Sequence, residues 1–412
     1  MNISHSLDWA VGNFRFIFEV TTMNGRKNWE KWLLRGLSYV LVAALSSAIT
    51  LQLWTARNRY DKLSELQRII EQQFVGDADM DLAQDAAAAA MVYALGDRWS
   101  YYIPAEEFAS YQENKDNAYV GIGVTIQVRE DGTGIDIQEV TPGGAAQIAG
   151  ILPGDILIKV DGQSVAGMDT EQVRNLVRGE ENTELTATVL RGGAEQTFTL
   201  KRQIIRVEVA SGKMLEGNIG LIKINNFNDN CGEETIAAVK TLLDQGAQKF
   251  IFDVRFNPGG YVAEMLEVLD FLLPEGVLFR QEDYMGRQYT EHSDEACLKL
   301  PMAVLVNADS YSAAEFFAAA LREYDWATVV GEKTIGKGYY QNTLMLSDGS
   351  AVNLSTGKYF TPKGVNLTEV GGLTPDVPLA VDEETAALIY AGAVPAAEDP
   401  QIQAAVAALA GK

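Results

Sequence analysis

The sequence predicts a multi-domain α/β protein preceded by one membrane-spanning helix. An uncharged apolar run fills residues 36–54, short strands with period-two alternation dominate residues 117–203, and strands alternate with helices through residues 204–381. The last pattern predicts βαβ units with right-handed crossovers around a mainly parallel sheet. With 412 residues, the chain is long enough for two or three domains, each with its own core.

The composition is that of a globular protein with an acidic surface. Hydrophobic residues make up 47% of the chain, charged residues make up 22%, and the net charge is -23. This sign of charge repels phosphate backbones, which argues against nucleic acid as a partner. The only two cysteines are Cys231 and Cys297, and the sequence leaves open whether they pair or stay as free thiols.

The apolar run at residues 36–54 is long enough to cross a bilayer core of about 30 Å as one helix. Four basic residues precede it between Arg26 and Arg35. The positive-inside rule therefore predicts that residues 1–35 are cytoplasmic and that the rest of the chain lies outside the cell membrane. We expect a single-pass membrane protein with an extracytoplasmic body. A cleaved signal peptide is the competing interpretation.

Helices and strands can be predicted along most of this body. Residues 55–116 predict a helical segment, and residues 117–203 predict short strands with a helix that is capped by Asp169 or Thr170. In the block that follows, the expected strands are 219–224, 249–254, 302–307 and 327–330, and the expected helices are 233–245, 261–273 and 313–323. Residues 382–412 predict a helical tail.

Ser312 and Lys337 are the candidate catalytic residues. Ser312 follows a predicted strand and precedes a predicted helix, so its hydroxyl is expected at a helix N-terminus. A serine becomes a strong nucleophile when a neighbouring base takes its proton. Histidine, the usual base, occurs only as His5 and His292, whereas Lys337 lies in a glycine-rich loop shortly after Ser312. Burial could keep this lysine neutral and let it act as the base. Taken singly, the serine also fits a helix N-cap and the lysine a solvated side chain.

Acyl transfer also needs N–H donors aimed at the developing oxyanion. The N–H of Ala313, at the start of the predicted helix, is one candidate. The second is the N–H of Gly259 or Gly260, in the turn after the predicted strand 249–254. Gln341 could orient a neutral lysine amine, or it could be an exposed strand residue.

Residues 117–203 resemble a PDZ domain. The resemblance rests on the loop Gly121–Val124 and on the segment Ala149–Leu157. In such domains a peptide C-terminus adds as a strand, and successive backbone N–H groups hold its carboxylate. The resemblance implies that the carboxylate-binding residues are Gly121, Ile122, Gly123 and Val124.

The chain from about residue 56 to residue 409 resembles the carboxyl-terminal processing proteases, also called tail-specific proteases, which combine a PDZ domain with a Ser-Lys protease domain. The motifs that carry the resemblance are Gly96–Tyr102, Asp253–Gly260, Ser310–Glu315, Thr334–Gly338 with Gln341, and Leu373–Asp376. The resemblance implies a protease domain at residues 204–381. It implies that Ser312 is the nucleophile, Lys337 the general base and Gln341 its orienting partner. It also implies oxyanion donors at Ala313 and at the Gly259–Gly260 turn.

Two residues depart from the family pattern. Tyr311 stands where the family usually has alanine, and Ile335 stands where an aromatic residue is common. Neither departure removes a catalytic atom. Tyr311 could narrow the pocket beside the nucleophile, so these departures bear on substrate preference more than on activity.

The expected function is a membrane-anchored serine endopeptidase that cuts extracytoplasmic proteins near their C-termini. Its partners would be protein or peptide substrates with free C-termini, no metal or other cofactor is implied, and a homo-oligomer is left open. The PDZ domain would deliver the substrate tail or, when empty, block the site. Two rival functions stay open: a membrane-tethered PDZ adaptor with a degenerate hydrolase domain, and an esterase or amidase that uses His292.

Overall fold

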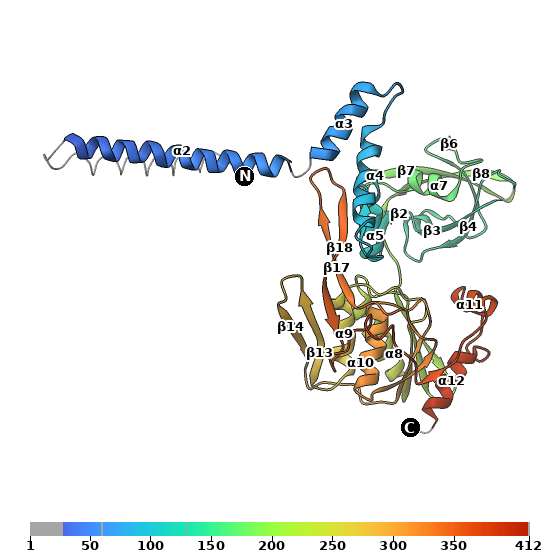
Figure 1. The fold of residues 1–412 in the computed structure, drawn as a ribbon. Coiled ribbons are helices and arrows are strands. Elements are labelled where there is room, and N and C mark those ends of the chain that lie inside the picture. The colour runs from blue at the N-terminus through green and yellow to red at the C-terminus, as the bar shows by residue number, and fades with distance from the viewer. Residues whose placement is uncertain (1–27, 59–60, 130, 411–412) are drawn as a thin grey trace. The chain divides into compact units, whose positions relative to one another are not determined.

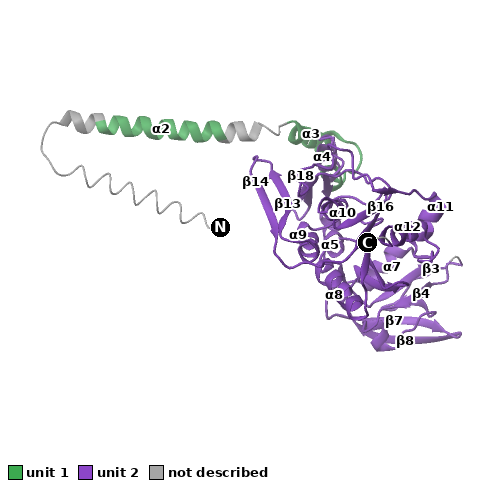
Figure 2. Cartoon of the chain, turned by 90° about the horizontal axis from the view of Figure 1, so that it is seen from below, with its two compact units in different colours: residues 1–84 green, residues 85–412 purple. Residues whose placement is uncertain are grey.

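The computed structural model describes residues 28–58, 61–129 and 131–410 (Figure 1). His5 and most of the expected cytoplasmic N-terminus lie outside the described residues. The chain forms two compact units, residues 1–84 and residues 85–412 (Figure 2). The described part of the first unit contains α2 (Asn28–Asn58), α3 (Asp61–Gln73) and the beginning of α4 (Met80–Tyr93). Every candidate site residue belongs to the second unit.

The predicted membrane-spanning run lies inside α2. Residues Leu34–Gln52 have a mean hydropathy of 1.6, and none of them is buried in the structure. By length and composition, this is the one helix of the described chain that could cross a membrane. The core helix of a soluble protein would be largely buried, so this exposure leaves a membrane anchor or a signal sequence.

A six-stranded antiparallel sheet follows α5 (Ala105–Lys115). Its strands are β3 (Val124–Val128), β4 (Ile135–Val140), β5 (Ile156–Val160), β6 (Gln163–Ser164), β7 (Glu184–Arg191) and β8 (Ala194–Lys201). Two helices accompany them, α6 (Ala145–Ala149) and α7 (Thr170–Val177). The pair β2 (Ala118–Gly121) and β9 (Gln203–Arg206) flanks this sheet in sequence and forms a small sheet of its own. Side chains such as Ile135, Leu157 and Val189 form a separate core within this segment.

The start of α7 confirms one of the two predicted helix caps. Asp169 is the N-cap, and its carboxylate accepts the N–H of Gln172 at 2.8 Å. The side chain of Gln172 accepts the N–H of Asp169 at 3.0 Å in return. This reciprocal capping satisfies two donors that the first helical turn would otherwise leave without a partner.

The central sheet of the following segment has the order β10-β11-β12-β15-β16-β19. Its strands are β10 (Ala210–Leu215), β11 (Ile219–Ile224), β12 (Lys249–Asp253), β15 (Met302–Val306), β16 (Ala327–Gly331) and β19 (Val377–Pro378). The pair β10–β11 is antiparallel, and the other pairings in this sheet are parallel. The four strands expected from the sequence are therefore confirmed as neighbours at the centre of this sheet.

Helices cover both faces of the central sheet, as the alternation of side chains along a strand requires. Ile224, Phe252 and Val304 point to one face, where they pack beneath α8 (Cys231–Asp244), α9 (Val262–Leu272) and α10 (Ala313–Glu323). Ile251, Ala303 and Leu305 point to the other face and pack with Ile402 and Ala405 of α12 (Pro400–Leu409). This segment also contains the short helix α11 (Glu383–Tyr390) and a second sheet.

A second sheet of this segment was not predicted from the sequence. It is wholly antiparallel and contains β1 (Tyr101–Ile103), β13 (Gly276–Asp283), β14 (Gln288–Ser293), β17 (Tyr339–Met345) and β18 (Ala351–Phe360). Most sheets of the described chain are antiparallel, so the expectation of a mainly parallel sheet is not supported. Among the strands of the described chain, parallel pairing occurs only in the central sheet, and one isolated parallel bridge joins Phe227 to Gly260. The antiparallel sheet was missed because strands such as β14 expose nearly all their side chains. Such strands lack the alternation of apolar and polar residues by which a strand is recognised in a sequence.

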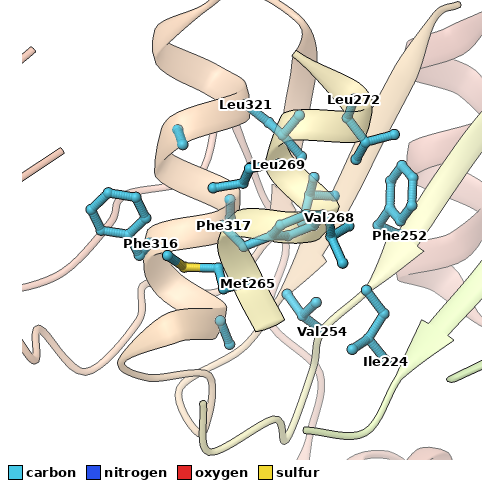
Figure 3. Packing of buried hydrophobic residues seen from close by; sticks show 14 of the residues in the cluster. Ile224, Phe252, Val254, Met265, Val268, Leu269, Leu272, Phe316, Phe317 and Leu321 are labelled. Atoms are coloured by element: carbon cyan, nitrogen blue, oxygen red, sulfur yellow. The ribbon is translucent and has the colours of Figure 1, made fainter. Parts of the chain in front are cut away.

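The packing of α10 fixes the position of the residue that precedes it, Ser312. Phe316, Phe317 and Leu321 of α10 lie against Met265 and Leu269 of α9 (Figure 3). Phe317 also meets Phe252 of β12 edge-on, with ring centroids 5.6 Å apart. Every residue of α10 from Ala313 to Leu321 is buried, so the start of this helix is held from all sides.

Both cysteines are free thiols in the structure. Cys231 is buried at the start of α8, and Cys297 is exposed. Burial raises the pKa of the Cys231 thiol to about 12, so this thiol stays protonated.

Candidate active site

Ser312 occupies a strained turn between β15 and α10. Its backbone has φ 60° and ψ -123°, in the positive-φ range that residues with a side chain rarely adopt. Such a conformation costs of order 1–3 kcal/mol and persists only where the surroundings enforce it. Here the fully packed helix α10 and the strand β15 enforce it, and Ser312 is left partly exposed at a cleft.

The cleft beside Ser312 has a volume of about 790 Å³. It brings together residues that are far apart in the chain. Lys115 comes from α5, the turn at Gly259 and Gly260 follows β12, and Lys337 lies between β16 and β17. The structure therefore brings Ser312, Lys337, Gln341, Ala313 and both glycines, as predicted from the sequence, to one cavity.

The amine of Lys337 lies among aromatic rings. Its Nζ is 4.7 Å from the ring centroid of Trp99 and 5.9 Å from that of Tyr311. Burial and then the positive charge of Lys115 lower the pKa of Lys337 to about 8, against the opposing charges of Asp97 and Glu315. A lysine with this pKa is partly neutral near physiological pH, as a general base must be.

Glu315 joins the serine turn to the lysine loop. Its carboxylate is completely buried and accepts the N–H groups of Ser312 at 3.1 Å, Gly336 at 2.6 Å and Lys337 at 2.8 Å, together with the hydroxyl of Thr334. Burial raises the pKa of Glu315, and these hydrogen bonds oppose the rise. One side chain therefore fixes the backbone of both candidate catalytic residues.

Tyr359 supports the lysine loop from β18. Its buried hydroxyl donates a hydrogen bond to the carbonyl oxygen of Lys337. Burial and then the charge of Glu315 raise the pKa of Tyr359, and the nearby Ser312 side chain lowers it. Tyr359 thus holds the backbone of Lys337 and lies near Ser312.

Gln341 lines the cleft from strand β17. Its Nε2 donates to the carbonyl oxygen of Tyr339 at 3.1 Å and to the hydroxyl of Ser355 at 3.0 Å. These two bonds fix the amide and leave its Oε1 as the atom available to an amine. The orienting role of Gln341 stays a prediction.

The glycine turn packs directly against the candidate nucleophile. A Cβ on Gly259 would lie 2.7 Å from Cβ of Ser312, and a Cβ on Gly260 would lie 2.2 Å from the carbonyl carbon of Phe227. Both distances are too short for a side chain, so only glycine fits at these two positions. The close approach puts backbone N–H groups beside the serine.

The two glycines differ in whether their N–H groups are available. The N–H of Gly259 donates to Oδ1 of Asn257 at 2.8 Å. Within the described chain, no acceptor is found for the N–H of Gly260 or for the N–H of Ala313. Of the three donors considered from the sequence, Gly260 and Ala313 therefore have N–H groups without a partner.

The predicted carboxylate-binding loop joins β2 to β3. Gly121 ends β2, Gly123 has φ 75°, and Val124 begins β3. The carbonyl oxygens of Ile122 and Gly123 accept the N–H groups of Ala146 and Thr141, whereas their own N–H groups find no acceptor in the described chain. This loop is thus pinned through its carbonyls, and the peptide-binding role of its N–H groups stays a prediction.

Several residues that line or support the cleft were not assigned a role from the sequence. Trp99 and Glu315 belong to motifs that were recognised there, but nothing in the motifs said what their side chains contact. Tyr359 and Lys115 carried no signal at all. In contrast, His292 lies exposed on β14 and does not line the cleft, so the geometry offers no support for it as a base beside Ser312.

Comparison with known proteins finds two families in this chain. Residues 218–379 match peptidase family S41, and residues 137–191 match the PDZ domain family. The chain is 34% identical over 328 residues to a probable CtpA-like serine protease of Staphylococcus aureus (strain COL), covering 78% of this chain and 65% of that relative. It thus spans slightly less than two thirds of that relative's length.

Two further relatives extend the comparison. The carboxy-terminal processing protease CtpA of Bacillus subtilis (strain 168) is 33% identical over 313 residues, which cover 75% of this chain and 67% of that protein. The crystal structure of a putative S41 protease from Bacteroides fragilis superposes with a TM-score of 0.50 at 16% identity, covering 84% of this chain and 96% of that one, and supports the fold alone. The chain therefore belongs to peptidase family S41, the family of the carboxyl-terminal processing serine proteases.

Proposed function

We propose that this protein is a serine endopeptidase in which Ser312 is the nucleophile and Lys337 is the general base. The observation that carries the proposal is the cleft in which a strained serine and a desolvated lysine lie on loops joined by one buried carboxylate, Glu315. Membership of the S41 family supports it.

The reaction follows from the groups in the cleft. Neutral Lys337 takes the proton of the Ser312 hydroxyl as its Oγ attacks the peptide carbonyl carbon. The N–H groups of Gly260 and Ala313 stabilise the oxyanion of the tetrahedral intermediate. The protonated lysine then gives its proton to the leaving amine, and an acyl-enzyme remains. Water activated by the same lysine hydrolyses the ester and restores the serine. The Oε1 of Gln341 would accept a hydrogen bond from the lysine amine and orient it.

The PDZ domain and α2 would decide which substrates reach this site. We propose that Gly121, Ile122, Gly123 and Val124 bind a substrate's C-terminal carboxylate, so that cleavage occurs near protein C-termini. The domain either delivers the tail or also blocks the cleft when it is empty. Helix α2 would anchor the enzyme in the cell membrane, with the N-terminus cytoplasmic and the catalytic part outside.

Single-residue variants test the catalytic assignment. Ser312→Ala and Lys337→Ala should each abolish cleavage of an unfolded protein substrate, because one removes the nucleophile and the other the base. Ser347→Ala and Lys333→Ala, which change exposed residues of the same types, should cut at the wild-type rate. Mass spectrometry of the products locates each cut relative to the C-terminus. Full cleavage by Lys337→Ala would refute the base assignment.

The same variants separate the rival functions. A tethered adaptor would bind peptide tails and cut nothing even as the wild-type protein. An esterase or amidase that uses His292 as its base would keep its activity in Lys337→Ala and lose it in His292→Ala. Under our proposal His292→Ala leaves cleavage unchanged.

A further inference from the structure

The cleft has a charge opposite to that of the chain that contains it. The protein carries a net charge of -23, yet the charged side chains that line the cleft are Arg98, Lys115 and Lys337, and no Asp or Glu lines it. A low-dielectric cleft lined by charges of one sign concentrates the electric field and attracts the opposite charge. Within an acidic protein, this cleft is thus a local attractor for anions.

Lys115 is one of the two cations of this set that the proposed catalysis does not use. It ends α5, and its Nζ lies 5.9 Å from the ring centroid of Tyr111 and 5.7 Å from that of Tyr261. Tyr261 directly follows Gly260, so the amine lies on the side of the cleft that holds the proposed oxyanion donor. Lys115 forms no ion pair with any residue that the structure describes. Burial lowers the pKa of Lys115, as expected for a cation removed from water without a counter-ion.

Arg98 is a second cation at the cleft. Its guanidinium lies over the ring of Trp99, 4.5 Å from the centroid, and like Lys115 it has no ion-pair partner among the residues described. Trp99 is also the ring that lies beside the Lys337 amine. Stacking on the indole holds the guanidinium at the wall while its N–H donors stay available.

The two acidic residues whose charges act on Lys337, Asp97 and Glu315, are engaged elsewhere. Glu315 accepts four hydrogen bonds behind the serine turn, and Asp97 accepts bonds from the hydroxyl of Ser100 at 2.6 Å and the N–H of Trp99 at 3.1 Å. Neither lines the cavity. The cavity wall therefore offers no carboxylate of its own to these cations, and a substrate carboxylate could fill that place.

We propose that the cleft selects polypeptide segments that carry a carboxylate close to the scissile bond, and that Lys115 is the residue that binds this carboxylate. The inference rests on the proposed peptidase function and names its substrate class. The carboxylate can belong to an Asp or Glu side chain or to the C-terminus of the chain being cut. Both sources present the same two oxygens to the amine, and the experiment distinguishes them.

Matched synthetic peptides that span one mapped cut provide the test. In the first arm, each position beside the cleaved bond is occupied in turn by Glu in one peptide and by Gln in its partner, and all these peptides have an amidated C-terminus. In the second arm, the residues around the bond stay the same, and peptides with a free C-terminal carboxylate are compared with amidated ones. The distance from the bond to the C-terminus is increased stepwise in this arm. For the wild type, we expect at least one peptide that carries the carboxylate to be cleaved with a kcat/KM about tenfold higher than that of the matched neutral peptide. A tenfold ratio is the effect expected from one hydrogen-bonded charge pair. An effect in the first arm shows that the carboxylate of an Asp or Glu side chain is recognised, and an effect in the second arm shows that the C-terminal carboxylate is recognised.

Variants of Lys115 decide whether this residue is responsible. Lys115→Met should bring the ratio close to one, Lys115→Arg should retain it, and Lys115→Glu should reverse it, because Met removes the positive charge, Arg keeps it and Glu replaces it with a negative charge. Lys213→Met, an exposed lysine on β10, is the matched control and should keep the wild-type ratio. A ratio near one for every pair in the wild type, or a ratio unchanged in Lys115→Met, would overturn the inference.

Binding separates this inference from the proposed function. Calorimetry of the preferred amidated Glu and Gln peptides with Ser312→Ala protein, with and without Lys115→Met, measures carboxylate recognition without any catalysis. Tighter binding of the Glu peptide that disappears with Lys115→Met supports the carboxylate site even if the peptidase assignment is wrong. If both peptides bind equally and the wild type still cleaves them, the carboxylate site is refuted but the proposed peptidase function is not.

Discussion

Two buried carboxylate networks hold the two sides of the cleft, and they are built differently. On the nucleophile and base side, Glu315 accepts three backbone N–H groups and one hydroxyl, all of them neutral donors. On the side of the glycine turn, the Arg255 guanidinium binds Asp253 at 2.6 Å and Asp399 at 2.9 Å, with all three side chains nearly inaccessible to water. The first network contains no cation, whereas the second holds its two carboxylates together with one guanidinium.

The difference indicates different tasks. The Arg255 network ties the end of β12, which leads into the glycine turn, to the N-cap of α12, so it stabilises the packing of the tail against the sheet. Glu315 lies next to the reacting groups, and its charge favours the protonated form of Lys337. We therefore expect changes in the first network to act on catalysis and changes in the second to act mainly on stability.

The largest effect is expected from Arg255→Met. It leaves two buried carboxylates without their cation, and breaking such a pair typically costs about 3–5 kcal/mol of unfolding free energy. Urea denaturation measures the loss. The control is Arg322→Met, whose ion pair with Asp376 is 2.7 Å long but has side chains 42% and 32% exposed, and it should cost at most about 1 kcal/mol. Equal losses in the two variants would contradict the structural role given to the Arg255 network.

Glu315→Gln should reduce kcat/KM by about 100-fold, because an amide cannot accept four hydrogen bonds with one oxygen and the two loops then shift relative to each other. Steady-state kinetics at saturating and limiting substrate, together with the thermal midpoint, measure the effect. If activity stayed near wild type while only the thermal midpoint fell, Glu315 would be a stability residue, and the proposed contrast between the two networks would be wrong.

Tyr359→Phe should have the smallest effect. It removes the hydroxyl that donates to the Lys337 carbonyl oxygen and should lower kcat/KM about fivefold, the value of one ordinary hydrogen bond. Tyr284→Phe, at an exposed position, is the matched control and should leave kcat/KM unchanged. A loss in Tyr359→Phe as large as that in Glu315→Gln would mean that the phenol itself takes part in the chemistry.

The sequence predicted the candidate catalytic residues better than it predicted their environment. Ser312 and Lys337 lie in motifs with recognisable glycines and small residues, and the parallel strands around them are continuous apolar runs. The contact of Trp99 with Lys337 could not be predicted, because it depends on β1 pairing with β18 about 250 residues later in the chain. The antiparallel strands β14 and β17, whose side chains are almost all exposed or half-buried, carry too little alternation to be recognised.

The role of Glu315 was hidden for a related reason. In the sequence it is one acidic residue in the first turn of a helix, where acids are common because they favour the helix N-terminus. Only the fold brings Thr334 and Gly336 within reach of its carboxylate. The choice between Gly259 and Gly260 likewise needed the hydrogen bond from Gly259 to Asn257, which no pattern of residue types specifies.

The pH dependence of kcat/KM tests the central claim, that Lys337 is the base, most directly. Burial lowers the pKa of Lys337 to about 8, so the amine is protonated and inactive below that pH and neutral above it. Peptide cleavage should therefore rise with pH to a plateau, with its half-maximum near pH 8, and His292→Ala should give the same curve. A half-maximum near the ordinary histidine pKa of ~6.5 that disappears in His292→Ala would contradict the account.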